Sequence, residues 1–167
     1  NGELYVTGRI KELIIIRGRN LYPQDIERTC VDAHEAVLTH GAAAISMKDK
    51  NGEERVILMC EVIKDEAIFD DIIEKVISNV NFQHQITLSA IFLVPRSTIP
   101  KTSSGKIQHH QILKLATANN NKTYHAWVSP DSEQLFNSTH KVDKTQKTKT
   151  EQHSLILFLH HAQALRN

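Results

Sequence analysis

The chain has little of what marks secreted, membrane-spanning or strongly charged proteins. Its two cysteines, Cys30 and Cys60, are too few for a disulfide scaffold and lack the spacing of metal ligands. The most apolar run, at 155–159, is too short to span a bilayer, and no signal peptide is expected. A net charge of +1 provides no strong field for nucleic acid or membrane. These absences favour a reduced, cytoplasmic protein with no nucleic-acid partner and no membrane span.

The length suits one ordinary domain with an appendage, and the apolar content of 40% is enough for a core. The first residue is Asn1 rather than methionine, from which we expect a fragment of a longer protein. From 119 to 151 the chain is polar and rich in lysine, as linkers are, and 154–165 has the pattern of a short amphipathic helix. We therefore expect a hinge and linker hairpin over 1–19, a compact unit over 20–118 and a linker-like tail of unknown role over 119–167.

Hydrophobic periodicity predicts an α+β fold, a small mixed sheet of about three strands packed by helices. The short apolar stretches 3–7 and 13–16 are expected to pair as a hairpin before that unit. The unit itself is expected to contain a helix from Pro23 to about His34, strands over 36–47 and 55–63 joined by a type I′ turn at Asn51-Gly52, a helix capped by Asp65, a strand over 89–94 and a helix over 108–118.

The segment Ile-Pro-Lys-Thr-Ser-Ser-Gly-Lys-Ile-Gln at 99–108 is the most informative part of the chain. It places Lys106 after a small, hydroxyl-rich turn and before a helix, where a lysine can reach a phosphate or carboxylate outside its own domain. The same residue types also occur in loops that only connect elements. A P-loop is excluded, because Pro100 stands where that motif needs its first glycine and Ile107 where it needs Ser or Thr.

Other candidate sites are weaker. The adjacent pairs His109-His110 and His160-His161 cannot easily share one face as metal ligands, so no metal site is expected. Ser103 and Ser104 have no neighbouring His and Asp pattern for a catalytic triad. The lysine-rich run 141–149 is typical of a solvated linker.

Two segments in the right order carry a family resemblance. Residues 7–27 (Thr-Gly-Arg-Ile-Lys-Glu-Leu-Ile-Ile-Ile-Arg-Gly-Arg-Asn-Leu-Tyr-Pro-Gln-Asp-Ile-Glu) resemble the hinge and first motif of the C-terminal subdomain of adenylate-forming enzymes, and 99–108 resembles their catalytic-lysine motif. These enzymes include acyl-CoA synthetases, luciferases and peptide-synthetase adenylation domains. Ile15, Arg19-Asn20 and the run 22–25 resemble the fatty acyl-AMP ligase branch, since acyl-CoA-forming relatives usually have lysine in place of Ile15.

The resemblance implies roles for individual residues. Lys106 would be the catalytic lysine, with Ser104 and Gly105 letting its loop enter the cleft of a large N-terminal domain. The resemblance also makes Lys11 the hinge, Arg9 a nucleotide contact and Gly18 the glycine that approaches the acyl-acceptor tunnel. Without the resemblance, Arg9, Lys11 and the weaker candidate Lys101 are ordinary solvated charges, and Gly18 ends a strand.

The resemblance further implies a reaction, in which a fatty acid and ATP, with Mg²⁺, give acyl-AMP and pyrophosphate. The acyl group would pass to the phosphopantetheine of an acyl carrier protein, and ATP would be bound mainly by the N-terminal domain of the same enzyme. The chain alone is therefore expected to be inactive. Two alternatives stay open, an acyl-CoA synthetase subdomain with CoA as acceptor and a non-catalytic module that docks a carrier protein.

Overall fold

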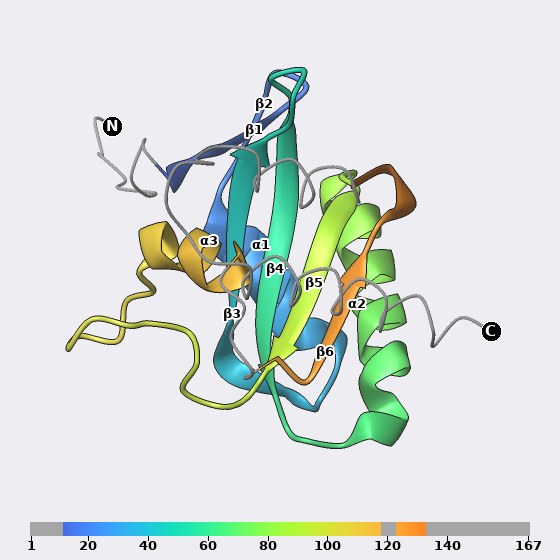
Figure 1. Ribbon diagram of the computed structural model, residues 1–167, viewed down its shortest axis with the longest axis vertical. Coiled ribbons are helices and arrows are strands. Elements are labelled where there is room, and N and C mark those ends of the chain that lie inside the picture. The colour runs from blue at the N-terminus through green and yellow to red at the C-terminus, as the bar shows by residue number, and fades with distance from the viewer. Residues whose placement is uncertain (1–11, 118–122, 133–167) are drawn as a thin grey trace, which may run out of the picture.

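The computed structural model describes residues 12–117 and 123–132, which form a four-stranded sheet, a separate two-stranded hairpin and three α-helices (Figure 1). In chain order, the elements are β1 Ile14–Ile16, β2 Arg19–Leu21, α1 Pro23–Ala33, β3 Val37–Lys48, β4 Glu54–Val62, α2 Phe69–His84, β5 Leu88–Val94, α3 His109–Thr117 and β6 His125–Val128, with 3-10 turns at Glu66–Ile68 and Pro130–Ser132.

The sheet has the order β3-β4-β5-β6, and only the central β4–β5 pair is parallel. Helix α2 makes the crossover that parallel strands require. Alternate residues of β4 point to opposite faces: Leu58 and Cys60 pack with α1 and α2, whereas Ile57 and Met59 pack on the side of α3. Because helices cover both faces, β4 and β5 are almost continuously apolar. The predicted α+β class is confirmed.

The predicted β3–β4 pair is confirmed, but its turn is different. Lys48 pairs with Glu54, so the turn spans 49–53 rather than two residues. Of Asn51 and Gly52 only the glycine has a positive φ, +80°, whereas a type I′ turn needs two such residues. The Asp49 carboxylate accepts the backbone N–H groups of Asn51 and Glu53 and ion-pairs with Arg55, which fixes the longer turn.

The expected pairing of 3–7 with 13–16 stays a prediction, because residues 3–7 lie outside the described residues. Within the described residues, β1 pairs with β2, in antiparallel register from Ile14↔Leu21 to Ile16↔Arg19. Arg17 and Gly18 connect them with φ of +50° and +76°, the two positive values of a type I′ turn. Gly18 lies in the turn that ends β1, as expected, whereas Asn20 belongs to β2, a strand that the sequence did not predict.

The sheet contains a fourth strand that sequence reasoning missed. β6 pairs antiparallel with the outer edge of β5, from Ala90↔Val128 to Leu93↔His125. It lies inside the stretch expected to be polar and irregular, so that expectation was wrong for residues 125–128. The terminal helix expected over 154–165 lies outside the described residues, and the division of the chain at 118 stays a prediction.

Candidate functional site

The lysine loop, residues 99–108, leaves the sheet after β5 and returns at the start of α3 (Figure 1). Its two arms pair through an antiparallel bridge between Lys101 and Ile107. The Gln108 N–H donates to the Pro100 carbonyl at 2.9 Å, which closes the base. Since Ile99 is buried and Ile107 packs on the same cluster, the loop has an anchored base and an exposed tip.

Lys106 stands at that tip with its backbone fixed. Its carbonyl accepts the Thr102 N–H at 2.8 Å, and its own N–H donates to the Thr102 hydroxyl at 3.1 Å. Gly105, at φ +80°, closes the turn by donating to the Thr102 carbonyl. Ser104, Gly105 and Lys106 are all exposed, so the structure brings these three predicted residues together on one tip. A cation held this way can meet an anionic group on a facing domain.

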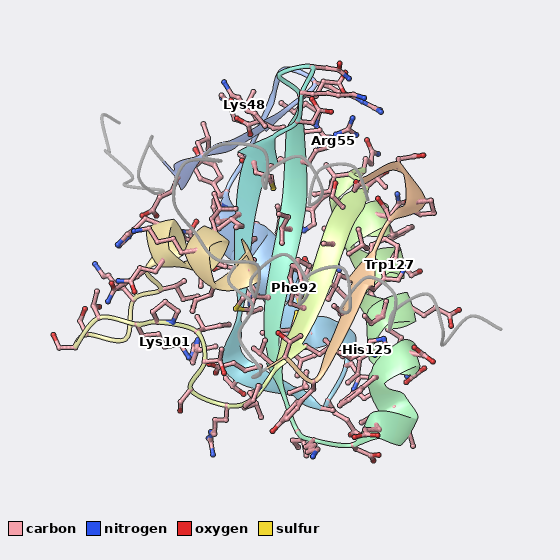
Figure 2. The ribbon with its side chains drawn as sticks, in the orientation of Figure 1. Lys48, Arg55, Phe92, Lys101, His125 and Trp127 are labelled. Atoms are coloured by element: carbon pink, nitrogen blue, oxygen red, sulfur yellow. The ribbon has the colours of Figure 1, made fainter. Side chains whose placement is uncertain are left out.

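The start of the lysine loop is held by Glu61 of β4. One carboxylate oxygen accepts the Ile99 N–H at 2.8 Å, and the other lies 3.4 Å from the Lys101 ammonium. Lys101, the weaker candidate, is therefore paired at the base of the loop rather than presented at its tip. Figure 2 shows Lys101 at the opposite end of the β3–β4 pair from Lys48 and Arg55.

The end of the loop is held by a second buried carboxylate. Glu27 of α1 accepts the Ala44 N–H of β3 at 2.9 Å, and the same oxygen lies 2.6 Å from His109 Nε2. His109, the first residue of α3, also has Nδ1 3.4 Å from the Glu12 carboxylate. Glu12 directly follows the predicted hinge, so this cluster connects the chain near the hinge to the chain just beyond the loop.

The remaining predicted residues are not brought to the lysine loop. Gly18 lies at the tip of the β1–β2 hairpin, which Figure 1 shows at the other end of the molecule from the loop. Arg9 and Lys11 lie outside the described residues. Glu54 ties the hairpin to the sheet by accepting the Ile15 N–H at 2.8 Å. The two tips that carry Lys106 and Gly18 thus lie on separate surfaces of the described structure.

Sequence reasoning missed Glu61 and Glu27. Glu61 did leave a signal, because it is a charged residue in the otherwise apolar run 56–62. Buried charges need partners, so an acidic residue there indicates a cation or N–H donor nearby. Glu27 left no such signal, since an acidic residue near the start of an amphipathic helix is common.

The described ranges contain no group of three or more His, Cys, Asp or Glu side chains that is able to hold a metal ion. Their helices are all too short or too polar to cross a membrane. Cys30 and Cys60 are buried free thiols with sulfurs 3.0 Å apart. The contact between them, together with burial, raises the pKa of the Cys30 thiol well above its usual range, which leaves it a poor nucleophile.

Comparison with known proteins places this site in context. The family model described as Disco-interacting protein 2-like, AMP domain, matches residues 11–126. The medium-chain-fatty-acid–acyl-carrier-protein ligase JamA of Moorena producens is 46% identical over 112 residues, covering 65% of this chain and 19% of that protein. The chain thus spans about a fifth of this curated relative.

Two solved structures share the fold. One comes from studies of fatty acyl-adenylate ligases from E. coli and L. pneumophila, with a TM-score of 0.57 and 36% identity over 70% of this chain and 20% of that one. The other, McyG A-PCP complexed with phenylalanyl-adenylate, has a TM-score of 0.63 and 29% identity over 68% of this chain and 18% of that one.

Proposed function

This chain belongs to the Disco-interacting protein 2-like AMP-domain family, within the adenylate-forming superfamily, and we propose a function for it on that basis. We propose that it is the mobile C-terminal subdomain of a fatty acid-activating ligase. The parent enzyme would convert a fatty acid and ATP to acyl-AMP and pyrophosphate. The observation that carries the proposal is the lysine loop, whose paired arms hold the backbone of Lys106 while its side chain stands in solvent.

Lys106 is the catalytic lysine in this proposal. Attack of a carboxylate on the α-phosphorus of ATP brings two anions together, and an ammonium group delivered between them stabilises the developing charge. Ser104 and Gly105 keep the tip narrow enough to enter the cleft of the N-terminal domain. That domain would hold ATP and its Mg²⁺, which neutralises phosphate charge. The chain alone is therefore inactive. A cytoplasmic location of the parent enzyme is a separate part of the proposal.

Rotation of the subdomain would serve the second half-reaction. Lys11 is the hinge, and Arg9 contacts the nucleotide on the N-terminal side of it. Because Gly18 and Lys106 lie on separate tips, turning the whole unit would withdraw one and present the other. The β1–β2 hairpin would then approach the tunnel through which the phosphopantetheine of an acyl carrier protein enters.

The acceptor is the finer part of the proposal. Carrier protein is favoured over CoA because Ile15 occupies the position where CoA-forming relatives usually have lysine, and because JamA is by name an acyl-carrier-protein ligase. A parallel transfer assay with CoA and with phosphopantetheinylated carrier protein distinguishes the two acceptors. Faster transfer to CoA would assign the chain to an acyl-CoA synthetase.

Replacing Lys106 by alanine in the full-length ligase tests the catalytic role. We expect ATP–pyrophosphate exchange to fall roughly 100- to 1000-fold, the usual loss when one charge-stabilising donor is removed. Lys48→Ala is the matched control, because Lys48 is exposed at the other end of the sheet. Unchanged exchange by the Lys106→Ala enzyme would contradict catalysis and favour a docking module that shares the fold.

A further inference from the structure

Glu61 is an ionisable residue in an environment that opposes ionisation. Its exposed fraction is 3%, and by strand alternation it lies on the face that carries Ile57 and Met59. A carboxylate leaves water for such a place only where hydrogen bonds and a counter-charge replace its hydration. The partners that it finds therefore indicate what the residue is there to hold.

Both partners belong to the lysine loop. The Ile99 N–H donates to one oxygen at 2.8 Å, and the Lys101 ammonium lies 3.4 Å from the other. Lys101 in turn faces Ile107 across the antiparallel bridge, and Ile107 is the direct neighbour of Lys106. Glu61 is thus connected to the backbone beside Lys106 through one ion pair, with Lys101, and one β-bridge, between Lys101 and Ile107.

The sheet is shaped to admit this side chain. Gly41, in the irregular stretch of β3 between Val37 and Ala42, lies against Glu61. A Cβ at Gly41 would stand 3.1 Å from the Glu61 Cβ, which is a tight contact. It would also stand 2.7 Å from the Leu38 carbonyl oxygen, which is closer than real Cβ contacts. A glycine at this position leaves the space that the Glu61 stem occupies.

We propose that Glu61 is a positioning residue for adenylate formation, which sets the direction in which the lysine loop presents Lys106. This inference rests on the proposed function of Lys106. Glu61 does not touch the reacting groups. It acts by holding Ile99 and Lys101, so that the tip enters the facing domain in one orientation rather than many.

Asp49 offers a matched comparison within the same strand pair. Like Glu61, it is a covered carboxylate that accepts backbone N–H groups and pairs with a cation, Arg55. Its side chain is 7% exposed. It lies at the opposite end of β3 and β4, where it holds a turn and not the lysine loop. Asp49→Asn therefore reports what the loss of such an anchor does to the fold alone.

The experiment uses the full-length ligase with Glu61→Ala, Glu61→Gln and Asp49→Asn, and it measures the two half-reactions separately. We expect Glu61→Ala to lower ATP–pyrophosphate exchange roughly 100-fold, the loss typical of a misplaced catalytic group. Glu61→Gln, which leaves no cavity and keeps an acceptor for the Ile99 N–H, should show a smaller loss. Transfer from supplied acyl-AMP to the acceptor should stay unchanged, since it does not use Lys106.

Each Glu61 variant is then combined with Lys106→Ala, which tests whether Glu61 acts through the lysine. If Glu61 acts through Lys106, neither Glu61 variant lowers exchange further once the lysine is gone. The inference is overturned if both half-reactions fall together, as expected of Asp49→Asn if it weakens the fold, or if the Glu61 losses persist in the Lys106→Ala background. If Lys106→Ala lowers exchange as expected but both Glu61 variants keep full exchange, the positioning role of Glu61 is rejected and the proposed function stands. If Lys106→Ala leaves exchange unchanged, the proposed function itself is rejected.

Discussion

Single residues around the lysine loop divide into an exposed cation and two buried carboxylates. Lys106 extends into solvent, whereas Glu61 and Glu27 are buried beneath the two ends of its loop. The position of Lys106 followed from the sequence because the motif is contiguous. The roles of the two glutamates did not, because Glu61 meets Ile99 across 38 residues and Glu27 meets His109 across 82. Contacts of that separation follow from topology rather than local pattern.

His84, at the end of α2, offers a pH-dependent test of packing between α1 and α2. Its Nε2 lies 2.8 Å from the Thr29 hydroxyl. Burial lowers the pKa of His84 from its ordinary 6.5, Arg19 lowers it further, and Asp25 opposes both. The unfolded chain therefore takes up more protons at this residue between pH 6.5 and the folded pKa, and acidification through that window lowers the free energy of unfolding.

NMR titration of the histidine rings checks this prediction. We expect the His84 resonance, identified by its absence in His84→Gln, to inflect below pH 6.5. Urea unfolding of the two proteins between pH 7.5 and 5.5 should show a smaller loss of stability on acidification in the variant. An inflection at or above the ordinary value would mean that the packing of α2 on α1 leaves the ring well hydrated.

The elements show where local pattern suffices. Helix α2 follows from the apolar spacing of Phe69, Ile72 and Val76, and the Asp65 carboxylate caps the turn before it by accepting the Ala67 N–H. The β1–β2 hairpin was missed because its turn is Arg17-Gly18, and arginine is an unusual residue at positive φ. The turn type predicted for the β3–β4 connection is wrong because the carboxylate of Asp49 stabilises a longer turn than the two-residue turn that Asn51-Gly52 predicts.

The irregularity in β3 should tolerate no side chain at Gly41. A methyl group there would meet the Leu38 carbonyl at 2.7 Å, and this contact is relieved only if the backbone shifts. We expect Gly41→Ala to lower the free energy of unfolding by about 1–3 kcal/mol, the usual cost of overpacking. Denaturant titration measures it.

Gly52→Ala is the control for Gly41→Ala, because a Cβ at Gly52 meets nothing within 4 Å and only the positive φ opposes it. That strain is worth about 1 kcal/mol. If Gly41→Ala costs no more than Gly52→Ala, the close approach of β3 to Glu61 is looser than its geometry indicates.

For the molecule as a whole, the fourth strand adds residues 125–128 to the sheet. The Tyr124 N–H donates to the Leu93 carbonyl, and the Ser129 N–H to the Ser89 carbonyl, so β6 is tied to β5 at both ends. Sequence reasoning missed this strand because it is only four residues long and follows an asparagine run. Its pairing partner, β5, is buried along its whole length and therefore needs cover on its outer edge.

Truncation tests the contribution of β6. We expect a chain ending at residue 118 to melt at lower temperature, and to associate more in size-exclusion chromatography, than one ending at residue 132. The reason is that loss of β6 leaves the apolar strand β5 as an open sheet edge. Equal melting temperatures and equal elution of the two chains would show that β6 adds nothing to the stability of the sheet.

The parallel pairing of β4 with β5 has a kinetic consequence. β3 and β4 can pair early because a short turn joins them. β5 can pair with β4 only after the longer connection through α2 has brought the two strands together. Glu61 lies on β4, and its partners Ile99 and Lys101 lie in the loop that follows β5. Its bonds to them must therefore form late in folding. Changes at Glu61 should therefore speed unfolding rather than slow folding, and the lysine loop takes its working shape only when the sheet beneath it is complete.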